Sequence, residues 1–387
     1  MEPNANGGFS LGKAILWLVV LVLIVGSFVL YGSSGSAKKD AIKIGVLLPL
    51  TGDAASFGEP ARKMIELAVE EINKTGGVGG QPLELVVEDS KCNGSDAATS
   101  TSKLINEDKV QVIIGGFCNS ETLAAVPLVT EKKVTLLSPA SGSAQLTGAS
   151  AFFFRIYPSD AVQGEVLATI SSTDKKWKKV GILQEQTDYA RDIYDGFSKT
   201  FTALDGTVVK EEFASNATDF KSVVTKMKSA KLDALFIDAQ TSATAALVLK
   251  QIEEQKWKPV ILLSSAVSGD PKTILENKTM LEGALAAEFG VTLNGAQFAA
   301  ALTAYQTKYG NESPYQSYAQ TEYDAVYMVR DALVAVGNDG TKIAEWFRMV
   351  KDFDGASGKI TIQADGDRDG GYVAKTVKDG KVELYQK

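Results

Sequence analysis

Short apolar runs alternate with amphipathic stretches along most of the chain, from Ala41 onward. The first run, residues 42–48 (IKIGVLL), is apolar at nearly every position, which is typical of a parallel strand buried on both faces. The stretch at 61–74 then repeats apolar residues at helical spacing. Further strands are expected at 83–89, 110–116, 134–138, 152–156, 180–184, 207–213, 234–238 and 260–265, with helices between them at 97–105, 121–130, 159–170, 190–204, 220–227 and 243–255.

Repeated strand–helix units predict parallel sheets with helices on both faces. Because a second series begins at residue 152, we expect an α/β protein with two Rossmann-like lobes. The last third of the chain breaks the alternation, with strands and tight turns following three successive helices at 297–309, 323–336 and 343–350. Asp379-Gly380 is a strong signal for a type I′ hairpin turn.

The apolar run at residues 14–31 is different, because its 18 positions carry no charge on any face. A helix of that length is just long enough to cross the hydrocarbon core of a bilayer. A cleaved signal peptide is the alternative, with Gly35-Ser36-Ala37 as the cut, but its apolar core is usually shorter. We expect an uncleaved single-pass anchor after a short cytoplasmic tail (1–13), followed by a small-residue linker (32–41).

Composition excludes several classes of function. Among 387 residues, 40 Lys and Arg stand against 47 Asp and Glu, which gives a net charge of −7, and histidine is absent. The acidic balance argues against a nucleic-acid partner. Without histidine there is no Ser–His–Asp triad and no zinc site of the HExxH kind. The two cysteines, Cys92 and Cys118, indicate a disulfide in an exported chain, with two buried free thiols as the alternative, so the large region is expected outside the cytoplasm.

Two motifs rich in glycine or aspartate are not expected to form binding sites. Residues 76–80 (GGVGG) follow a helix and precede a strand, the reverse of a dinucleotide-binding loop, so we expect a turn. Asp365, Asp367 and Asp369 open like a calcium loop, but Thr376 stands where the bidentate Glu belongs, so a solvated turn is expected. No cofactor and no metal are expected.

The polar loops after the strands are better candidates, since ligands of open α/β sheets bind beyond the carboxyl ends of the strands. In one of these loops, Asn119, Ser120 and the N–H groups of the following helix suit a carboxylate, a plain helix N-cap being the alternative. Convergence of several such loops predicts a ligand cleft. The four loops are 117–122, 139–143, 185–189 and 238–241.

Five stretches, taken together and in this order, resemble one family. They are IGVLLPLTGDAASFGEPARKMIELAVEEINKTGGVGGQPLELVVEDSKC, VIIGGFCNSET, LLSPASGSAQLTG, FRIYPSDAVQG and YDAVYMVRDAL. Through them the chain from Ala41 to Lys387 resembles the type I periplasmic solute-binding proteins, in particular the leucine/isoleucine/valine-binding branch that serves ATP-driven (ABC) importers. The resemblance implies two lobes that close on a small ligand, permease subunits as partners, and no catalysis. It also supports the Cys92–Cys118 pair, which falls where many members carry a disulfide in the first lobe.

The family's organisation, two lobes joined by three crossovers, divides the chain into discontinuous halves. It implies a first lobe built from 42–158 and 288–366, and a second lobe built from 159–287 and 367–387. The family also implies contacts to the ligand's carboxylate. Asn119 stands where the family uses a Ser for this purpose, and Ala140 stands where a backbone group assists.

Aromatic positions of the family's pocket are carried over in part. Phe57 occupies the position of an aromatic wall, and Tyr189 that of the tyrosine which the second lobe brings over the ligand. Gln240 replaces a common aromatic residue. Tyr323 takes a further pocket-aromatic position.

Two departures from the family concern the ligand's α-ammonium. Gly142 stands where a Thr hydroxyl usually meets this group, and Ala266 stands where an acidic residue usually pairs with it. A buried ammonium without an anion is costly, so other side chains must replace them or the ligand lacks the amine. The candidate replacements are Asp238, Asp188 and Glu185 for the anion, and Ser141 and Ser143 for the hydroxyl.

We therefore expect an extracytoplasmic, membrane-tethered substrate-binding receptor of an ABC importer. A branched-chain or other hydrophobic amino acid is the default ligand. Three alternatives remain open: a binder of an amide, urea or aromatic acid; a domain that reports its ligand to a partner sensor; and an enzyme that uses a carboxylate pair including Asp188 or Asp238.

Overall fold

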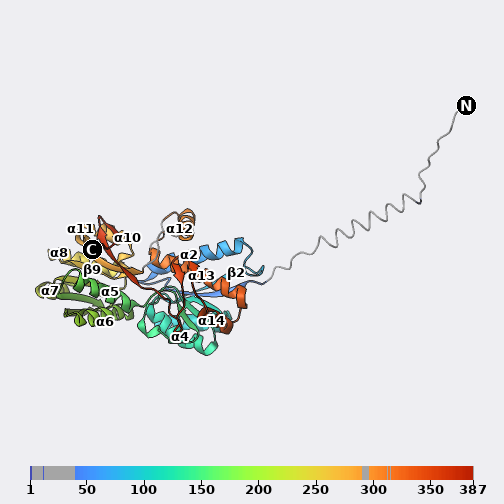
Figure 1. The fold of residues 1–387 in the computed structure, drawn as a ribbon, viewed down its shortest axis with the longest axis horizontal. Coiled ribbons are helices and arrows are strands. Elements are labelled where there is room, and N and C mark those ends of the chain that lie inside the picture. Colours follow the sequence, from blue (N-terminus) through green and yellow to red (C-terminus); the bar gives the residue numbers. More distant parts are fainter. Residues whose placement is uncertain (2–11, 13–39, 290–295, 312, 314, 387) are drawn as a thin grey trace.

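The computed structural model describes residues 1, 12, 40–289, 296–311, 313 and 315–386. From residue 40 onward, the described residues form two lobes side by side (Figure 1). The apolar stretch at 14–31, predicted as an anchor, lies outside the described residues. Within them, no helix combines the length and the apolar character that a membrane span requires.

The first lobe contains a five-stranded parallel sheet in the order β2-β1-β3-β4-β5. Its strands are β1 (Ile42–Leu48), β2 (Leu83–Asp89), β3 (Val112–Gly115), β4 (Thr135–Ser138) and β5 (Phe153–Arg155). Helices of this lobe are α2 (Ala55–Lys74), α3 (Gly94–Asn106) and α4 (Asn119–Lys132), joined from late in the chain by α12 (Ala296–Tyr309), α13 (Gln316–Val336) and α14 (Gly340–Arg348). The short η1 (Ala144–Leu146) follows β4.

The second lobe contains a seven-stranded sheet in the order β14-β13-β10-β9-β8-β6-β7. The strands are β6 (Lys179–Glu185), β7 (Thr207–Phe213), β8 (Ala234–Asp238), β9 (Ile261–Leu263) and β10 (Leu285–Phe289), all parallel, with β13 (Tyr372–Lys378) and β14 (Lys381–Leu384) antiparallel at one edge. Its helices are α5 (Asp160–Thr173), α6 (Asp188–Ala203), α7 (Lys221–Ser229), α8 (Ser242–Glu254), α9 (Ser265–Ser268), α10 (Pro271–Glu276) and α11 (Lys278–Leu281). A small hairpin, β11 (Phe353–Gly355) with β12 (Gly358–Ile360), precedes β13.

The strand registers bring the predicted loops to one edge of each sheet. Leu48 at the end of β1 pairs with Asp89 at the end of β2, and Leu47 pairs with Gly115 at the end of β3. The loops after β1, β2 and β3 therefore leave the first sheet together, as expected for parallel strands. The edge β hairpin also follows its prediction, because Asp379 and Gly380 have φ angles of 51° and 74°, as a type I′ turn requires.

Two helices of the second lobe pack unusually closely, which fixes the residues at their amino ends. A Cβ on Gly164 of α5 would lie 2.1 Å from the Ile193 carbonyl oxygen, and one on Gly196 of α6 would lie 2.1 Å from the Ala161 carbonyl oxygen. Only glycine permits this approach of two helix backbones. The first residues of α5 and α6, Asp160 and Asp188, both lie beside the cleft described next.

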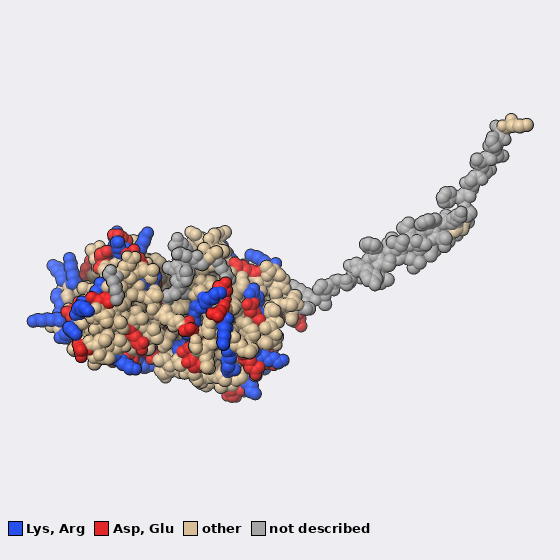
Figure 2. All heavy atoms as spheres, viewed as in Figure 1, with Lys and Arg blue, Asp and Glu red and all other residues tan. Residues whose placement is uncertain are grey.

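Acidic and basic side chains are mixed over most of the face shown in Figure 2. Charge of both signs therefore surrounds the lobes on this face, with no broad basic surface of the kind that nucleic-acid binding uses.

Candidate ligand-binding cleft

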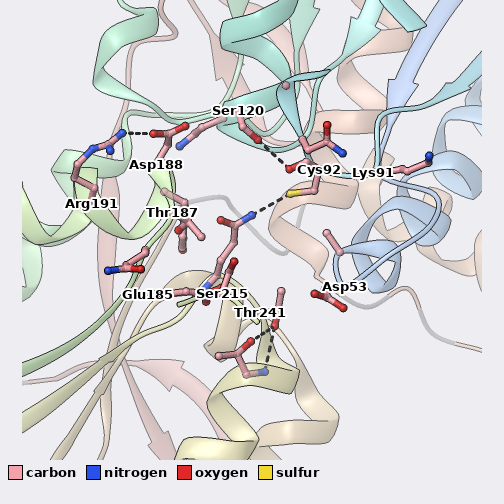
Figure 3. Close-up of a pocket in the computed structure, with 18 residues that line it drawn as sticks. Asp53, Lys91, Cys92, Ser120, Glu185, Thr187, Asp188, Arg191, Ser215 and Thr241 are labelled. Carbon is pink, nitrogen blue, oxygen red and sulfur yellow. Dashed lines mark hydrogen bonds and ion pairs between the residues drawn. The ribbon is translucent and has the colours of Figure 1, made fainter. Parts of the chain in front are cut away.

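A cavity of about 430 Å³ lies between the lobes, with walls from both (Figure 3). Loops after β1, β2 and β3 supply one wall, and loops after β6, β7 and β8 supply the other. The loops that the sequence predicted to converge therefore do so in part. The lining residues are Asp53, Ala54, Lys91, Cys92, Asn93, Gly94, Asn119, Ser120, Glu185, Gln186, Thr187, Asp188, Tyr189, Arg191, Ser215, Gln240, Thr241 and Thr244.

A smaller cavity of about 30 Å³ lies deeper and shares Asn119, Tyr189 and Gln240 with the outer one. Its walls are largely aromatic, and none of its lining side chains is basic. The ring centroids of Phe117 and Tyr318 are 5.0 Å apart. The lining residues are Phe57, Phe117, Cys118, Asn119, Ala140, Tyr189, Gln240, Ala266 and Tyr318. This inner cavity is an apolar pocket at the base of a polar cleft.

The structure brings most of the predicted site residues to these two cavities. Those at the cavities are Phe57, Asn119, Ser120, Ala140, Tyr189, Gln240 and Ala266. Three others, Ser141, Gly142 and Asp238, line neither cavity. The Ser141 hydroxyl is directed into the first lobe, where it donates to the Gly116 carbonyl oxygen at 3.0 Å.

The prediction that Tyr323 lines the pocket is wrong. Its hydroxyl donates to Glu71 Oε2 of α2 at 2.6 Å, so the ring packs between α13 and α2 inside the first lobe. The pocket aromatic from this region is Tyr318, which lies in the first turn of α13. Tyr323 lies five residues farther along α13 than Tyr318, so its side chain projects from a different face of the helix.

Asn119 makes three side-chain hydrogen bonds. Its side-chain oxygen accepts from the N–H groups of Gly142 at 2.9 Å and Ser143 at 3.0 Å, and its Nδ2 donates to Asp160 Oδ2 at 2.7 Å. These bonds tie three loops together on the first-lobe wall. Among the described residues, the backbone N–H groups of Asn119 and Ser120 have no acceptor, and they stand in the first turn of the 14-residue helix α4. That turn suits an anion.

Gly142 is required by the position of Asp160. A Cβ on Gly142 would lie 2.1 Å from Asp160 Oδ1, so the Asp160 carboxylate fills the volume that a larger side chain at this position would need. The Asp160 N–H also donates to the Gly142 carbonyl oxygen at 2.7 Å. This contact explains physically why the hydroxyl is missing here.

Replacing Gly142 with Ala should displace the Asp160 carboxylate and break its bond with Asn119. We expect a loss of about 1–3 kcal/mol in the free energy of unfolding, measured by urea denaturation. In an Asp160→Ala background the added methyl has room, so the same substitution should cost much less. Equal losses in both backgrounds would contradict the contact as the cause.

Three buried carboxyl groups lie near the cleft without a basic partner. Burial, together with the charge of Asp53, raises the pKa of Glu185 to about 7. Burial also raises the pKa of Asp160 to about 7, and it raises the pKa of Asp238 well above its usual value, with help from the charges of Glu185 and Asp160. Both Asp238 oxygens lack a hydrogen-bond partner among the described residues. Of the three, Glu185 lines the outer cavity, whereas Asp160 and Asp238 line neither cavity.

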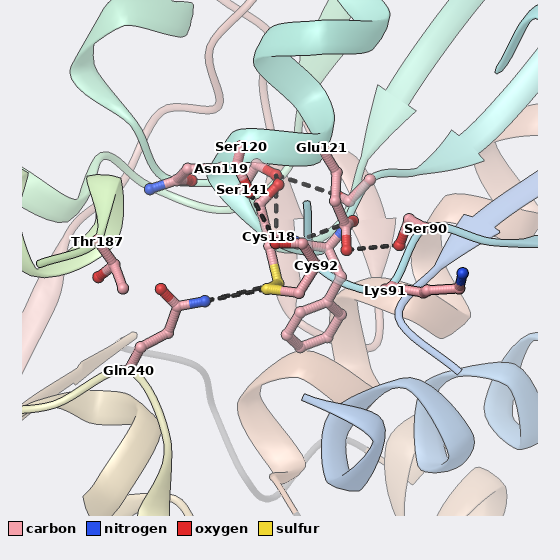
Figure 4. The surroundings of a disulfide bond; sticks show 12 residues. Ser90, Lys91, Cys92, Cys118, Asn119, Ser120, Glu121, Ser141, Thr187 and Gln240 are labelled. Atoms are coloured by element: carbon pink, nitrogen blue, oxygen red, sulfur yellow. Dashed lines mark hydrogen bonds between the residues drawn. A yellow bond between two sulfur atoms is a disulfide. The ribbon is translucent and has the colours of Figure 1, made fainter. Parts of the chain in front are cut away.

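The predicted disulfide is confirmed, and it stands at the start of α4 (Figure 4). Cys92 and Cys118 have Cα atoms 5.4 Å apart, and Gln240 Nε2 from the second lobe donates to Cys92 Sγ at 3.1 Å. The nearby Glu121 is no metal ligand, because it accepts from Ser90 Oγ at 2.6 Å and from two backbone N–H groups. The disulfide therefore fixes the loop that carries Asn119.

Sequence reasoning missed several residues that line the cavities, among them Asp53, Arg191 and Tyr318, and it missed Asp160, which contacts the lining residue Asn119. Asp160 directly follows the Ser159 N-cap at the start of α5, a position at which an acidic residue ordinarily stabilises the helix end. The position of Asp160 beyond the end of β5 was the available signal that it lies near the loops of the cleft. Asp53 follows β1 in the same way.

Comparisons with known proteins agree with this architecture. The family model described as "Periplasmic binding protein" matches residues 41–381. A leucine-, isoleucine-, valine-, threonine- and alanine-binding protein of Pseudomonas aeruginosa is 26% identical over 338 residues, which are 87% of this chain and 89% of that protein.

Two solved structures are similar in fold. The branched-chain amino acid transporter substrate-binding protein of Streptococcus pneumoniae, in complex with isoleucine, has a TM-score of 0.80 and 28% identity, covering 89% of this chain and 98% of that one. A solute-binding protein of an ABC transporter from R. palustris, in complex with benzoate, has a TM-score of 0.80 and 22% identity, covering 89% and 95%. At 22% identity, the comparison with the R. palustris protein supports a similar fold and nothing more.

Proposed function

The chain belongs to the periplasmic binding protein family, and we propose that it is the substrate-binding receptor of an ATP-driven importer. The observation that carries this proposal is the cavity between the two lobes, because both lobes contribute walls to it. The protein is a binding component and not an enzyme, so we assign no catalytic residue.

A branched-chain or other hydrophobic amino acid is the ligand that the relatives' names favour. Two features of the cleft support it. The aromatic inner cavity, with Phe57 and Tyr189 in its wall, suits an apolar side chain. The N–H groups of Asn119 and Ser120, which have no acceptor among the described residues, suit a carboxylate.

We propose the lobe boundaries as 42–158 with 288–366, and 159–287 with 367–387. The sheet order supports this division, because β1 to β5 form one sheet while β6 to β10 and β13 form the other, but β10 ends at Phe289 and so extends past the boundary at 287. A ligand held by both walls favours the closed arrangement, and a permease can then distinguish a loaded receptor from an empty one.

We also propose that residues 14–31 anchor the receptor in the cell membrane with its lobes outside the cytoplasm. The support is the uncharged apolar run of 18 residues and its length. In the same arrangement, residues 32–41 form a tether that keeps the lobes close to the permease.

Thermal unfolding of the full chain in detergent, with the twenty amino acids and a set of carboxylates and amides, tests the function. A ligand present at 100 times its Kd should add about 2.7 kcal/mol to the free energy of unfolding and raise the midpoint by several degrees. Stabilisation by leucine, isoleucine or valine is expected. A panel in which no compound shifts the midpoint would contradict the proposed function.

A binder of an amide, urea or aromatic acid is the second candidate. Gly142 and Ala266 favour it, because both replace groups that usually meet the ammonium of an amino acid. The benzoate complex of the R. palustris protein shows that this fold accommodates such an acid. Stabilisation by these compounds alone would select this candidate.

A further inference from the structure

A further cavity, of about 240 Å³, lies at the edge of the second-lobe sheet that carries β10, β13 and β14. Helices α9 and α10 and the first residues of α13 complete its walls. It shares no described lining residue with the two cavities of the cleft. A ligand in this cavity would therefore occupy a site separate from the cleft.

Lys375 of β13 is the unusual residue of this cavity, because only 8% of it is exposed. It lies opposite Ala286 in the antiparallel pairing of β13 with β10. Glu288 is two residues farther along β10, so the side chains of Lys375 and Glu288 share one face of the sheet. Both residues line the cavity, and the sheet therefore presents a buried lysine to it.

The Lys375 ammonium makes no hydrogen bond and no ion pair with any described residue. Glu288 is not a direct partner: its Oε1 accepts from Ser268 Oγ at 2.7 Å, and burial raises the pKa of Glu288 in spite of the charge of Lys375. A buried ammonium without an acceptor is costly. A negatively charged group that enters the cavity would supply this acceptor.

Two further features of the wall suit an anion. Lys381 of β14 lines the cavity, is exposed and forms no ion pair with a described residue. Gln316 and Ser317 begin the 21-residue helix α13, and their N–H groups have no acceptor in the described part of the chain. The amino end of a helix attracts negative charge. Because Glu288 is the only acid among the described lining residues, the balance of charge on this wall is positive.

Size and apolar contacts limit what the cavity can hold. Its wall also contains Pro271, Ile274, Phe289 and Val382. Sites for drug-sized ligands usually measure about 300–1,000 Å³, so a cavity of about 240 Å³ suits a smaller molecule. A short carbon chain that ends in a carboxylate matches the size of the cavity, its apolar contacts and its charge.

We propose that this cavity is a second ligand site, which binds a small aliphatic carboxylic acid with its carboxylate on Lys375. A hydroxyl on the same ligand would donate to Glu288 Oε2, which has no donor among the described residues. Tyr315 stands between this site and the cleft, because it lines the new cavity while its ring centroid lies 4.3 Å from that of Phe57 in the inner cavity. The second site goes beyond the proposed receptor function and does not depend on it.

The test measures binding of three matched four-carbon compounds to the full chain in detergent by calorimetry. The compounds are butyrate, 4-hydroxybutyrate and 1,4-butanediol, which lacks a carboxylate. Both acids should bind, 4-hydroxybutyrate more tightly, and the diol should not. Lys375→Met keeps a long side chain but removes the ammonium, so it should weaken the binding of both acids at least about tenfold, the size expected for a hydrogen bond to a charged group.

Lys378→Met is the matched control, because Lys378 lies in the same hairpin but is exposed and does not line the cavity. It removes the same charge, and the affinity for either acid should change by less than about twofold. Val382→Phe enlarges a half-buried residue of the wall and serves as the second test if Lys375→Met does not fold. It should remove binding of both acids by filling the cavity.

The outcomes are distinct from those of the amino acid screen. Equal affinities of wild type and Lys375→Met for butyrate would overturn the second site, because the acid would then bind elsewhere, the cleft included. Binding of the diol as tight as that of the acids, or no binding of either acid, would overturn it as well. Unchanged binding to Val382→Phe would have the same meaning. In each case the receptor function would stand or fall on the cleft alone.

Discussion

Replacing Arg155 with Met should lower the free energy of unfolding by about 3 kcal/mol. The Arg155 side chain is fully buried, and its guanidinium donates to Asp367 Oδ1 at 2.7 Å, to Asp367 Oδ2 at 2.6 Å and to the Ser143 carbonyl oxygen at 2.7 Å. Met fills similar space but leaves the Asp367 carboxylate without its cation. A broken buried pair is costly because the remaining charge stays desolvated.

The position of this pair gives it a further consequence. Arg155 ends β5, and Asp367 lies between β12 and β13, so the pair joins two segments by which the chain passes between the lobes. Urea unfolding should therefore show a lower midpoint for the variant. Arg62→Met is the control, because Arg62 pairs with Glu59 and Glu66 on the partly exposed face of α2 and should cost below about 1 kcal/mol. Equal losses for the two variants would refute the argument.

The same pair shows where the sequence was misleading. The aspartate-rich stretch at 365–369 was expected to be a solvated turn, yet Asp367 has both oxygens bonded to Arg155. The local sequence indicated a turn correctly, but Arg155, the partner of Asp367, is 212 residues away in the chain. A contact of that range leaves no local signal.

Local patterns predicted the regular elements well. β1, β2, β7 and β8 have the predicted bounds, because their β-branched and apolar runs end at clear loop signals. Strand β10 was not predicted, since its sequence LAAEF is rich in alanine and its strand conformation depends on pairing with β9 and β13. Helix α2 begins at Ala55, earlier than the predicted 61, and includes Pro60.

Site residues could be predicted where a single loop identified them. Contacts between two loops could not be predicted from the sequence. Asn119 and Ser120 were found because their loop follows a strand, whereas Tyr189 and Gln240 were assigned through the family resemblance. The contact between Asp160 and Gly142 depends on how α5 packs against the loop after β4, which no spacing rule encodes.

Removing the disulfide should have the largest effect on stability. The Cys92–Cys118 bridge closes a loop with a sequence separation of 26 residues, and the chain-entropy relation gives about 3.5 kcal/mol for a loop of that length. The double variant Cys92→Ser with Cys118→Ser should therefore unfold at a markedly lower urea concentration than wild type. Added reductant should lower the midpoint of wild type and leave that of the variant unchanged.

The bridge should also matter for binding, because it stands beside the first turn of α4 and accepts from Gln240 of the second lobe. Without it, the loop that carries Asn119 and Ser120 must be ordered by the ligand itself, which weakens affinity by the free energy of that ordering. Under conditions in which the double variant is still folded, calorimetry should show weaker binding of the ligand identified for wild type. Unchanged affinity would mean that Glu121, which accepts from the N–H groups of Phe117 and Cys118, orders this loop by itself.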